Sequence, residues 1–145
     1  MSDPVENILV EANYIGTDAT GEYALGNGYS GVSTSGQNIV IQYNLISGGE
    51  GNGIQLGWDA QSCEIRSNYI GTDYYGASAL GNASAGVYIS GAQNNMIGGS
   101  PEDMNLISGN DNAGVFMNFQ HAQGNVVANN YIGTDTSGTS AVPNF

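Results

Sequence analysis

A six-residue phrase that returns along the chain constrains the fold more than any other feature. Asn-Tyr-Ile-Gly-Thr-Asp occurs at Asn13–Asp18, Asn68–Asp73 and Asn130–Asp135 of the 145 residues. A shorter relative, Asn-Leu-Ile-Ser, lies between these copies at Asn44–Ser47 and Asn105–Ser108. Such spacing is typical of stacked repeats, in which one unit cannot bury its own apolar face. The repetition therefore predicts a solenoid.

Alignment of these phrases divides the chain, as one domain over residues 1–145, into five coils. The coils begin near residues 6, 37, 61, 93 and 123, and the last is incomplete. Each coil carries three short apolar stretches, the third of which alternates with period two, as half-buried strands do. The apolar positions of the first two stretches are Val10, Ile41, Ile65, Ile97, Val127 and Ile15, Ile46, Ile70, Ile107, Ile132.

Three short parallel strands per coil predict an all-β fold, a right-handed single-stranded parallel β-helix. Strands of neighbouring coils would lie about 4.8 Å apart, so that like residues stack on like. Insertions at residues 17–25, 72–80 and 134–142 predict long loops on alternate coils. A leucine-rich horseshoe is the alternative, but its Leu-x-x-Leu-x-Leu pattern is missing.

The phrases that span Asn68–Asn82, Asn94–Gly99 and Asn105–Asn110 resemble those of the bacterial right-handed parallel β-helix repeat proteins of the pectate-lyase-like superfamily. The resemblance covers nearly the whole chain. It implies a secreted or cell-surface location, although the chain carries no signal peptide. It implies no single activity, because this fold carries lyases, hydrolases, epimerases, adhesins and inert spacers.

The charge balance narrows the class of partner. Thirteen acidic residues stand against one Arg, which gives a formal net charge of −12. Nucleic acid and anionic membranes require Lys and Arg, so both are excluded as partners, and no apolar stretch is long enough to insert into a bilayer. Cations, neutral sugars and proteins remain open. The single Cys63 has no disulfide partner, and we expect it to be buried.

Two recurring polar residue types predict different roles. One Asn at the bend of each coil predicts a buried ladder of side-chain hydrogen bonds, formed by Asn13, Asn44, Asn68, Asn105 and Asn130. The carboxylates of Asp18, Asp73 and Asp135 recur in the long loops and are candidate Ca²⁺ ligands, the one cofactor considered. Because they lie on alternate coils, roughly 10 Å apart, local turns are the favoured alternative.

Aromatic residues supply the candidate ligand-binding positions. Exposed Tyr and Trp beside acidic groups stack on sugar rings or contact proteins, and the candidates are Tyr23, Tyr74, Tyr75, Trp58 and Asp59. Packing between stacked loops is the alternative for the tyrosines. A further column is expected to face outward, either as an interface stripe or beneath the long loops: Tyr14, Leu45, Tyr69, Leu106 and Tyr131.

No phrase marks a catalytic site, so enzymatic activity stays open, with a non-enzyme favoured. Proton abstraction needs a base and a basic group, and only Arg66 and His121, on separate turns, are candidates. We expect Arg66 to pair with Glu64 or Glu11. Two facing carboxylates, as in glycosidases, could come from Glu64 with Glu11 or with Asp59, but no motif singles them out.

The fifth coil stops where its third strand should begin. Either the chain is a fragment of a longer repeat protein or a second copy covers the open end. The second case predicts a homodimer through Tyr131, Ile132, Val142 and Phe145.

Three functions are therefore considered. The favoured one is a structural or adhesive module that self-associates, and the alternative is a carbohydrate-binding or polysaccharide-active domain. An ice or mineral binder is disfavoured, because it needs Thr on every coil of a flat face. Thr17, Thr72 and Thr134 occur on alternate coils.

Overall fold

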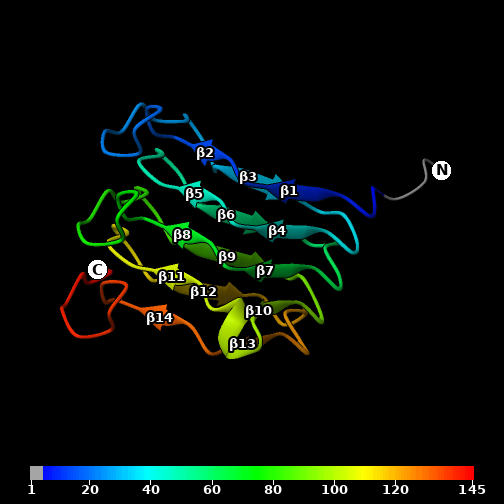
Figure 1. Ribbon diagram of the computed structural model, residues 1–145. Helices are drawn as coiled ribbons and strands as arrows, with labels where there is room; N and C mark the ends of the chain where they lie inside the picture. Colours follow the sequence, from blue (N-terminus) through cyan, green and yellow to red (C-terminus); the bar gives the residue numbers. More distant parts are fainter. Residues whose placement is uncertain (1–4) are drawn as a thin grey trace.

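The computed structural model describes residues 5–145 and confirms the parallel β-helix that the repeats predict (Figure 1). The chain passes through three sheets in turn and then repeats the circuit one rung further along. All pairs of strands are parallel. Neighbours in a sheet therefore come from successive coils.

The three sheets share a simple order along the axis. The first contains β1 (Leu9–Glu11), β4 (Val40–Gln42), β7 (Glu64–Arg66), β10 (Met96–Gly98) and β13 (Val126–Ala128). The second contains β2 (Tyr14–Ile15), β5 (Leu45–Ile46), β8 (Tyr69–Ile70), β11 (Leu106–Ile107) and β14 (Tyr131–Ile132). The third contains β3 (Val32–Thr34), β6 (Ile54–Leu56), β9 (Val87–Ser90) and β12 (Val115–Asn118).

The apolar columns expected from the repeats are confirmed by the strand registers. In the first sheet Ile41 pairs with Ile65, and Ile65 pairs with Ile97. In the second sheet Ile46 pairs with Ile70. Stacked β-branched side chains fit the same pleat on each rung, so the columns form one continuous core.

The central coils carry most of this core. Ile41, Ile65 and Ile97 are fully buried. Burial of each such side chain contributes about 1.5–3 kcal/mol. Cys63 lies in the same core, and desolvation by burial raises the pKa of its thiol.

The Asn ladder is confirmed. The side-chain amide of each Asn donates to the side-chain oxygen of the Asn on the next coil, with distances of 3.0, 3.1, 3.1 and 2.9 Å from Asn13 to Asn130. The amide of Asn68 also donates to the carbonyls of Ile41 and Arg66. These bonds hold the bend between the first two sheets.

The ladder compensates an unfavourable backbone conformation. The residue before the Asn is left-handed at four of these bends, with φ between 54° and 56° at Ala12, Tyr43, Ser67 and Asn129. For a residue with a side chain this conformation costs about 1–2 kcal/mol.

Two shorter ladders at other bends were not predicted. Asn82 donates to Asn110 and Asn110 donates to Asn144, both at 2.9 Å. Asn95 donates to Asn125 at 2.9 Å and accepts the backbone amide of Cys63 at 2.9 Å. Each of the three bends of a coil therefore has a column of Asn side chains, although the two shorter columns extend over only some of the coils.

The three long loops leave one edge of the solenoid, at the left in Figure 1, and contact each other directly. The amide of Tyr74 donates to the carbonyl of Gly21 at 2.9 Å, and the amide of Thr136 donates to the carbonyl of Gly76 at 3.1 Å. These bonds pass over the second and fourth coils, which lack long loops. We call residues 17–25, 72–80 and 134–142 the loop ridge.

The opposite edge carries shorter insertions on the other set of coils. Parallel bridges align Gln37 with Gln61 and Gln61 with Gln93, and the amide of Gly57 donates to the carbonyl of Thr34, which leaves Trp58 and Asp59 as extra residues of the second coil. The corresponding turn of the fourth coil contains His121. We call residues 57–60 and 118–122 the turn edge.

Little helical structure interrupts this pattern. A 3-10 turn, η1 (Pro101–Asp103), lies in the extra loop of the fourth coil. Among residues 5–145 no helix has the length and apolar character needed to cross a bilayer.

Candidate functional site

The carboxylates of the loop ridge are engaged within their own loops. Asp18 accepts the backbone amides of Glu22 and Tyr23, and Asp73 accepts those of Ala77 and Ser78. Asp135 does the same with the amides of residues 139 and 140. In residues 5–145 no group of three or more His, Cys, Asp or Glu side chains is arranged to hold a metal ion. The geometry favours the local turn over the Ca²⁺ site.

These hydrogen bonds stabilise the charged form of two carboxylates. Desolvation alone would raise the pKa of Asp18, but the hydrogen bonds from Thr20 and from the loop backbone outweigh it and lower the pKa. The hydroxyl of Ser137 is the main cause of a lowered pKa at Asp135. Both effects come from neutral donors, so they need no bound cation.

An open groove lies where the loop ridge meets the second sheet. Its volume is about 330 Å³, and its lining is Tyr14, Tyr43, Asn44, Leu45, Ser67, Tyr69 and Tyr74. Tyr43 and Ser67 come from the left-handed bend, Tyr14 and Tyr69 from the second sheet, and Tyr74 from a long loop. We call this the tyrosine groove.

Beneath the loop ridge lies a second small apolar layer outside the cylinder, and one of its residues, Leu45, also lines the tyrosine groove. Leu45 and Leu106, which face outward, are only 4% and 2% exposed. Glycines of the long loops lie against them, because a Cβ at Gly21 would meet Leu45 at 2.7 Å and one at Gly76 would meet Leu106 at 2.7 Å. These leucines of the outward column therefore pack beneath the loop ridge. Packing beneath the long loops was one of the two alternatives for this column, and an interface stripe was the other.

Aromatic side chains continue from the groove onto the ridge. The ring of Tyr74 lies 5.8 Å from that of Tyr14 and 5.4 Å from that of Tyr75. The hydroxyl of Tyr75 donates to Glu22 at 3.3 Å, and the negative charge of Glu22 raises the pKa of Tyr75. Tyr23 is exposed on the same ridge. Three predicted ligand-binding tyrosines thus share one surface.

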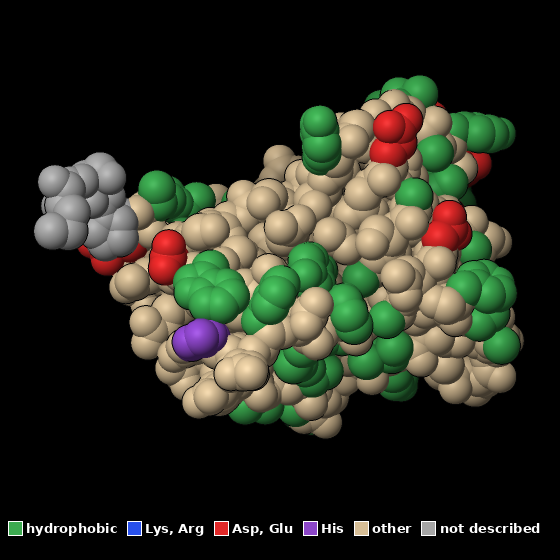
Figure 2. All heavy atoms as spheres, turned by 180° about the vertical axis from the view of Figure 1, so that it is seen from behind, with side chains coloured by type: hydrophobic (Ala, Val, Ile, Leu, Met, Phe, Trp, Pro, Cys, Tyr) green, Lys and Arg blue, Asp and Glu red, His purple; other side chains and the backbone are tan. Residues whose placement is uncertain are grey.

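Trp58 and Asp59 lie apart from these tyrosines, on the turn edge. The Trp58 ring lies 4.7 Å from that of His121 and 5.7 Å from that of Phe119. In Figure 2 the purple imidazole lies against hydrophobic side chains at one edge of the molecule. A second open pocket of about 210 Å³ adjoins them, lined by Gln37, Trp58, Asp59, Ala60, Gln61 and Gln93.

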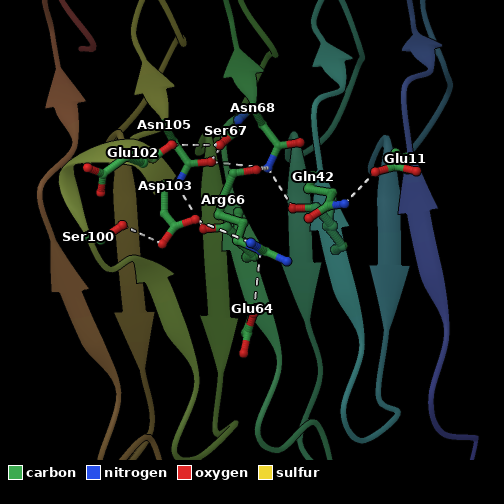
Figure 3. Close-up of polar contacts among 12 residues, drawn as sticks. Glu11, Gln42, Glu64, Arg66, Ser67, Asn68, Ser100, Glu102, Asp103 and Asn105 are labelled. Atoms are coloured by element: carbon green, nitrogen blue, oxygen red, sulfur yellow. Dashed lines mark hydrogen bonds and ion pairs between the residues drawn. The ribbon is translucent and has the colours of Figure 1, made fainter.

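The structure does not bring the two candidate basic groups together. Arg66 pairs with Glu64 at 3.4 Å and with Asp103 at 3.3 Å (Figure 3). The pairing with Glu64 is confirmed, whereas Glu11 contacts Gln42 instead. His121 packs against Trp58 in the turn edge, with the two rings tilted by 50°. The two basic side chains therefore lie at separate places, and each already contacts other side chains.

The four residues expected to form a dimer interface differ in exposure. Ile132 is 44% exposed and Phe145 is 80% exposed, so both can be reached. Val142 is only 6% exposed, because its backbone pairs with Gly133 and Gly109 and draws it against the preceding coil. Tyr131 is partly covered by its own loop at Gly138. Val142 therefore presents little surface to a partner, and the interface as a whole stays a prediction.

Sequence reasoning missed two of the seven residues that line the tyrosine groove. Tyr43 and Ser67 carry no repeated phrase of their own, because they occupy the bend position that varies from coil to coil. A usable signal is their place directly before the repeated Asn, which puts them beside the outward column.

Comparison with known proteins found no match: no protein-family model, no curated protein and no solved structure is similar to this chain.

Proposed function

We propose that this chain is a non-enzymatic interaction module, in which a stiff β-helix presents the tyrosine groove to a partner protein. The observation that carries the proposal is the groove itself, an open recess lined by four tyrosines over a buried leucine. Tyrosines supply large contact area with few rotatable bonds and a polar end, which suits protein interfaces.

The loops that wall the groove are held in place before any partner binds. Each long loop is closed by an antiparallel bridge, and adjacent loops share a backbone hydrogen bond. The Asn ladder fixes the bend that carries Tyr43. Walls that are already ordered lose little conformational entropy on binding.

Charge indicates the chemistry of the partner. The ridge beside the groove carries Asp18, Glu22 and Asp73, and the whole chain has a net charge of −12. Such a field attracts a positively charged surface and speeds its approach. The partner proposed is therefore a basic protein segment with an aromatic or apolar anchor that enters the groove.

Membership of the pectate-lyase-like β-helix superfamily stays a proposal of the same kind. It is supported by the shared fold type and by the phrases around Asn68–Asn82 and Asn105–Asn110. It adds no activity, because the fold type hosts many functions.

Selection of a displayed random-peptide library on the immobilised protein tests the function. We expect enriched peptides to combine one aromatic residue with flanking Lys or Arg, and to bind less tightly as salt rises. The double variant Tyr43→Ala with Tyr74→Ala is expected to weaken their binding at least tenfold.

Tyr29→Ala is the matched control, because Tyr29 is an exposed tyrosine outside the groove. It should leave peptide binding unchanged. Selection that enriches no common sequence, or enriched peptides that bind the groove variant as well as the wild type, would overturn the proposal.

Self-association through the last coil stays a prediction. Val127 and Ile132 continue core columns that are fully buried in the central coils, yet they are 37% and 44% exposed. A second copy that covers them would bury this apolar surface. Sedimentation at micromolar concentration should show a dimer that Ile132→Asp converts to monomer, and a monodisperse wild-type monomer would contradict it.

A further inference from the structure

We infer that the turn edge is a second binding site, whose ligand is a neutral polysaccharide chain that runs along the solenoid axis. This site lies on a different surface from the tyrosine groove and goes beyond the proposed function. Its components are a column of glutamines, the ring of Trp58 and the carboxylate of Asp59, which together line the pocket of about 210 Å³.

The glutamines recur at one position of successive coils. Parallel bridges join Gln37 to Gln61 and Gln61 to Gln93, so the three residues lie on consecutive rungs. Within residues 5–145 none of their carboxamides makes a hydrogen bond to another protein group, whereas that of Gln123 on the last coil donates to the carbonyl of Gln120. Three carboxamides are thus free to contact a ligand.

The contrast with the asparagine columns shows that these free groups are unusual in this molecule. Asn68 is buried, and its side chain donates to three acceptors and accepts two donors. Gln61, at a comparable place in the same coil, points to solvent. A carboxamide that meets no protein group has both a donor and an acceptor to offer.

Trp58 is held as a platform beside this column. Gly91 of the next coil leaves room for the ring, since a Cβ there would meet it at 2.5 Å. His121 and Phe119 support the ring from the fourth coil, and Trp58 itself stays 50% exposed. The ring is therefore positioned by two coils and still presents surface to a ligand.

This combination fits a polyhydroxylated ligand. Sugar hydroxyls both donate and accept, as carboxamides do, and the apolar face of a sugar ring packs on an indole. No Lys or Arg lines the pocket, and Asp59 would repel an anion, so acidic polysaccharides do not fit. Rungs about 4.8 Å apart repeat the same carboxamide, which suits a ligand that itself repeats.

Binding can be followed at the site itself, because Trp58 is the single tryptophan of the chain. The probes are neutral oligosaccharides of one to six hexose units, with oligomers of a uronic acid as the charged comparison. We expect a saturable change of tryptophan emission with the neutral probes, stronger binding with longer ones, and no change with the acidic ones.

Three variants locate the ligand by calorimetry. Trp58→Ala and Gln61→Ala should each weaken binding of the longest neutral probe at least tenfold, and both residues are exposed enough for the fold to persist. Gln55→Ala is the matched control, because Gln55 contacts Ser30 and Asn52 outside the pocket. It should leave the affinity unchanged.

Three results would overturn the inference. The first is the absence of binding by any neutral probe in both fluorescence and calorimetry. The second is an affinity that falls as much in Gln55→Ala as in Trp58→Ala, and the third is an affinity that falls with Tyr43→Ala and Tyr74→Ala but not with Trp58→Ala. Basic peptides selected on the tyrosine groove should bind Trp58→Ala normally, so failure of one site is distinguishable from failure of the other.

Discussion

The two edges of the solenoid bridge from coil to coil in different ways. At the loop ridge, insertions on the first, third and fifth coils join by backbone hydrogen bonds, such as that from Tyr74 to Gly21 at 2.9 Å. At the turn edge, insertions on the second and fourth coils join through aromatic rings, with Trp58 and His121 4.7 Å apart. The structural repeat is therefore two coils rather than one.

In both cases glycine on the skipped coil makes the contact feasible. At the loop ridge, Gly48 and Gly109 lie where a Cβ would meet Ala24 at 2.6 Å and Ala79 at 2.8 Å. At the turn edge, Gly91 has the same role for Trp58. The difference is that the loop ridge is closed by polar backbone groups, whereas the turn edge leaves its rings and carboxamides partly open. We expect the first edge to contribute more to stability.

Removal of an Asn ladder residue next to each edge should give the largest difference in unfolding free energy between the loop ridge and the turn edge. Asn110→Ala removes the acceptor of both the backbone amide and the side-chain amide of Asn82, and it removes one of the two donors to the carbonyl of Ile70. At about 1–3 kcal/mol per buried group we expect a loss of about 4 kcal/mol in unfolding free energy. Asn95→Ala, at the base of the turn edge, should cost about 2 kcal/mol, because its partner Asn125 is already partly exposed. Urea unfolding measures both, and a larger loss for Asn95→Ala would reverse the comparison.

Substitution of glycines should separate the edges further. At Gly76 a Cβ would meet Thr136 at 2.3 Å and Leu106 at 2.7 Å, so Gly76→Ala combines backbone strain with overpacking and should cost about 3 kcal/mol. Gly91→Ala should cost about 1–2 kcal/mol, because the half-exposed Trp58 can move into solvent.

Gly138→Ala is the control for these glycines. It occupies the same loop position as Gly76 with a similar φ, but its nearest neighbour, the Tyr131 ring, lies 3.1 Å away. Only the backbone cost of about 1–2 kcal/mol should remain. An equal loss of unfolding free energy at Gly76 and Gly138 would show that the loops do not press on each other.

Extension of a ladder should strengthen the turn edge. Cys63 lies in the column of Asn95 and Asn125, and its thiol is 3.4 Å from the carbonyl of Gly36. In Cys63→Asn the new amide can donate to Gly36 and Asn95, so we expect a gain of about 1 kcal/mol in unfolding free energy. The gain should vanish in the Asn95→Ala background. A loss in the wild-type background would mean that the column cannot hold a third carboxamide.

The smallest expected effect is on the pH dependence of stability in acid. The pKa of Asp18 and of Asp135 is lower in the folded protein than its ordinary value, so their stabilising effect is present above about pH 4. It is lost as the pH falls through the folded-state pKa, because the unfolded chain then binds the proton more readily. Thermal unfolding should therefore depend less on pH below about pH 4 in Asp18→Asn with Asp135→Asn.

Asp59→Asn, outside the long loops, is the control for this pH dependence. An unchanged pH dependence in the double variant would show that the loop hydrogen bonds do not favour the carboxylate form. It would not alter the comparison of the two edges, which depends on packing.

The arrangement of the coils was readable from the repeated phrases. Ile41, Ile65 and Ile97 stack because a parallel register sets each residue against its equivalent, and such a register follows from phrase alignment alone. The ladder from Asn13 to Asn130 follows for the same reason. A position that repeats on every coil packs against the equivalent residues of the coils before and after it. Its neighbours along the axis can therefore be read from the aligned phrases.

Positions that do not repeat required the tertiary structure. Arg66 forms an ion pair with Asp103, which lies in the extra loop of the fourth coil. Tyr43 lines the same groove as Tyr74, which comes from a long loop. No periodicity specifies those pairs, because they depend on how far each insertion bends over the outside of the cylinder. Val142 is buried for the same reason, since the last long loop returns against the fourth coil.

Periodic apolar and amide side chains were thus sufficient to define the cylinder and its inward columns, since identical residues on adjacent rungs satisfy each other. The two candidate binding surfaces arose from insertions of unequal length on alternate coils. Their contacts are set by side-chain packing across a skipped rung, which the one-dimensional spacing of the phrases does not contain.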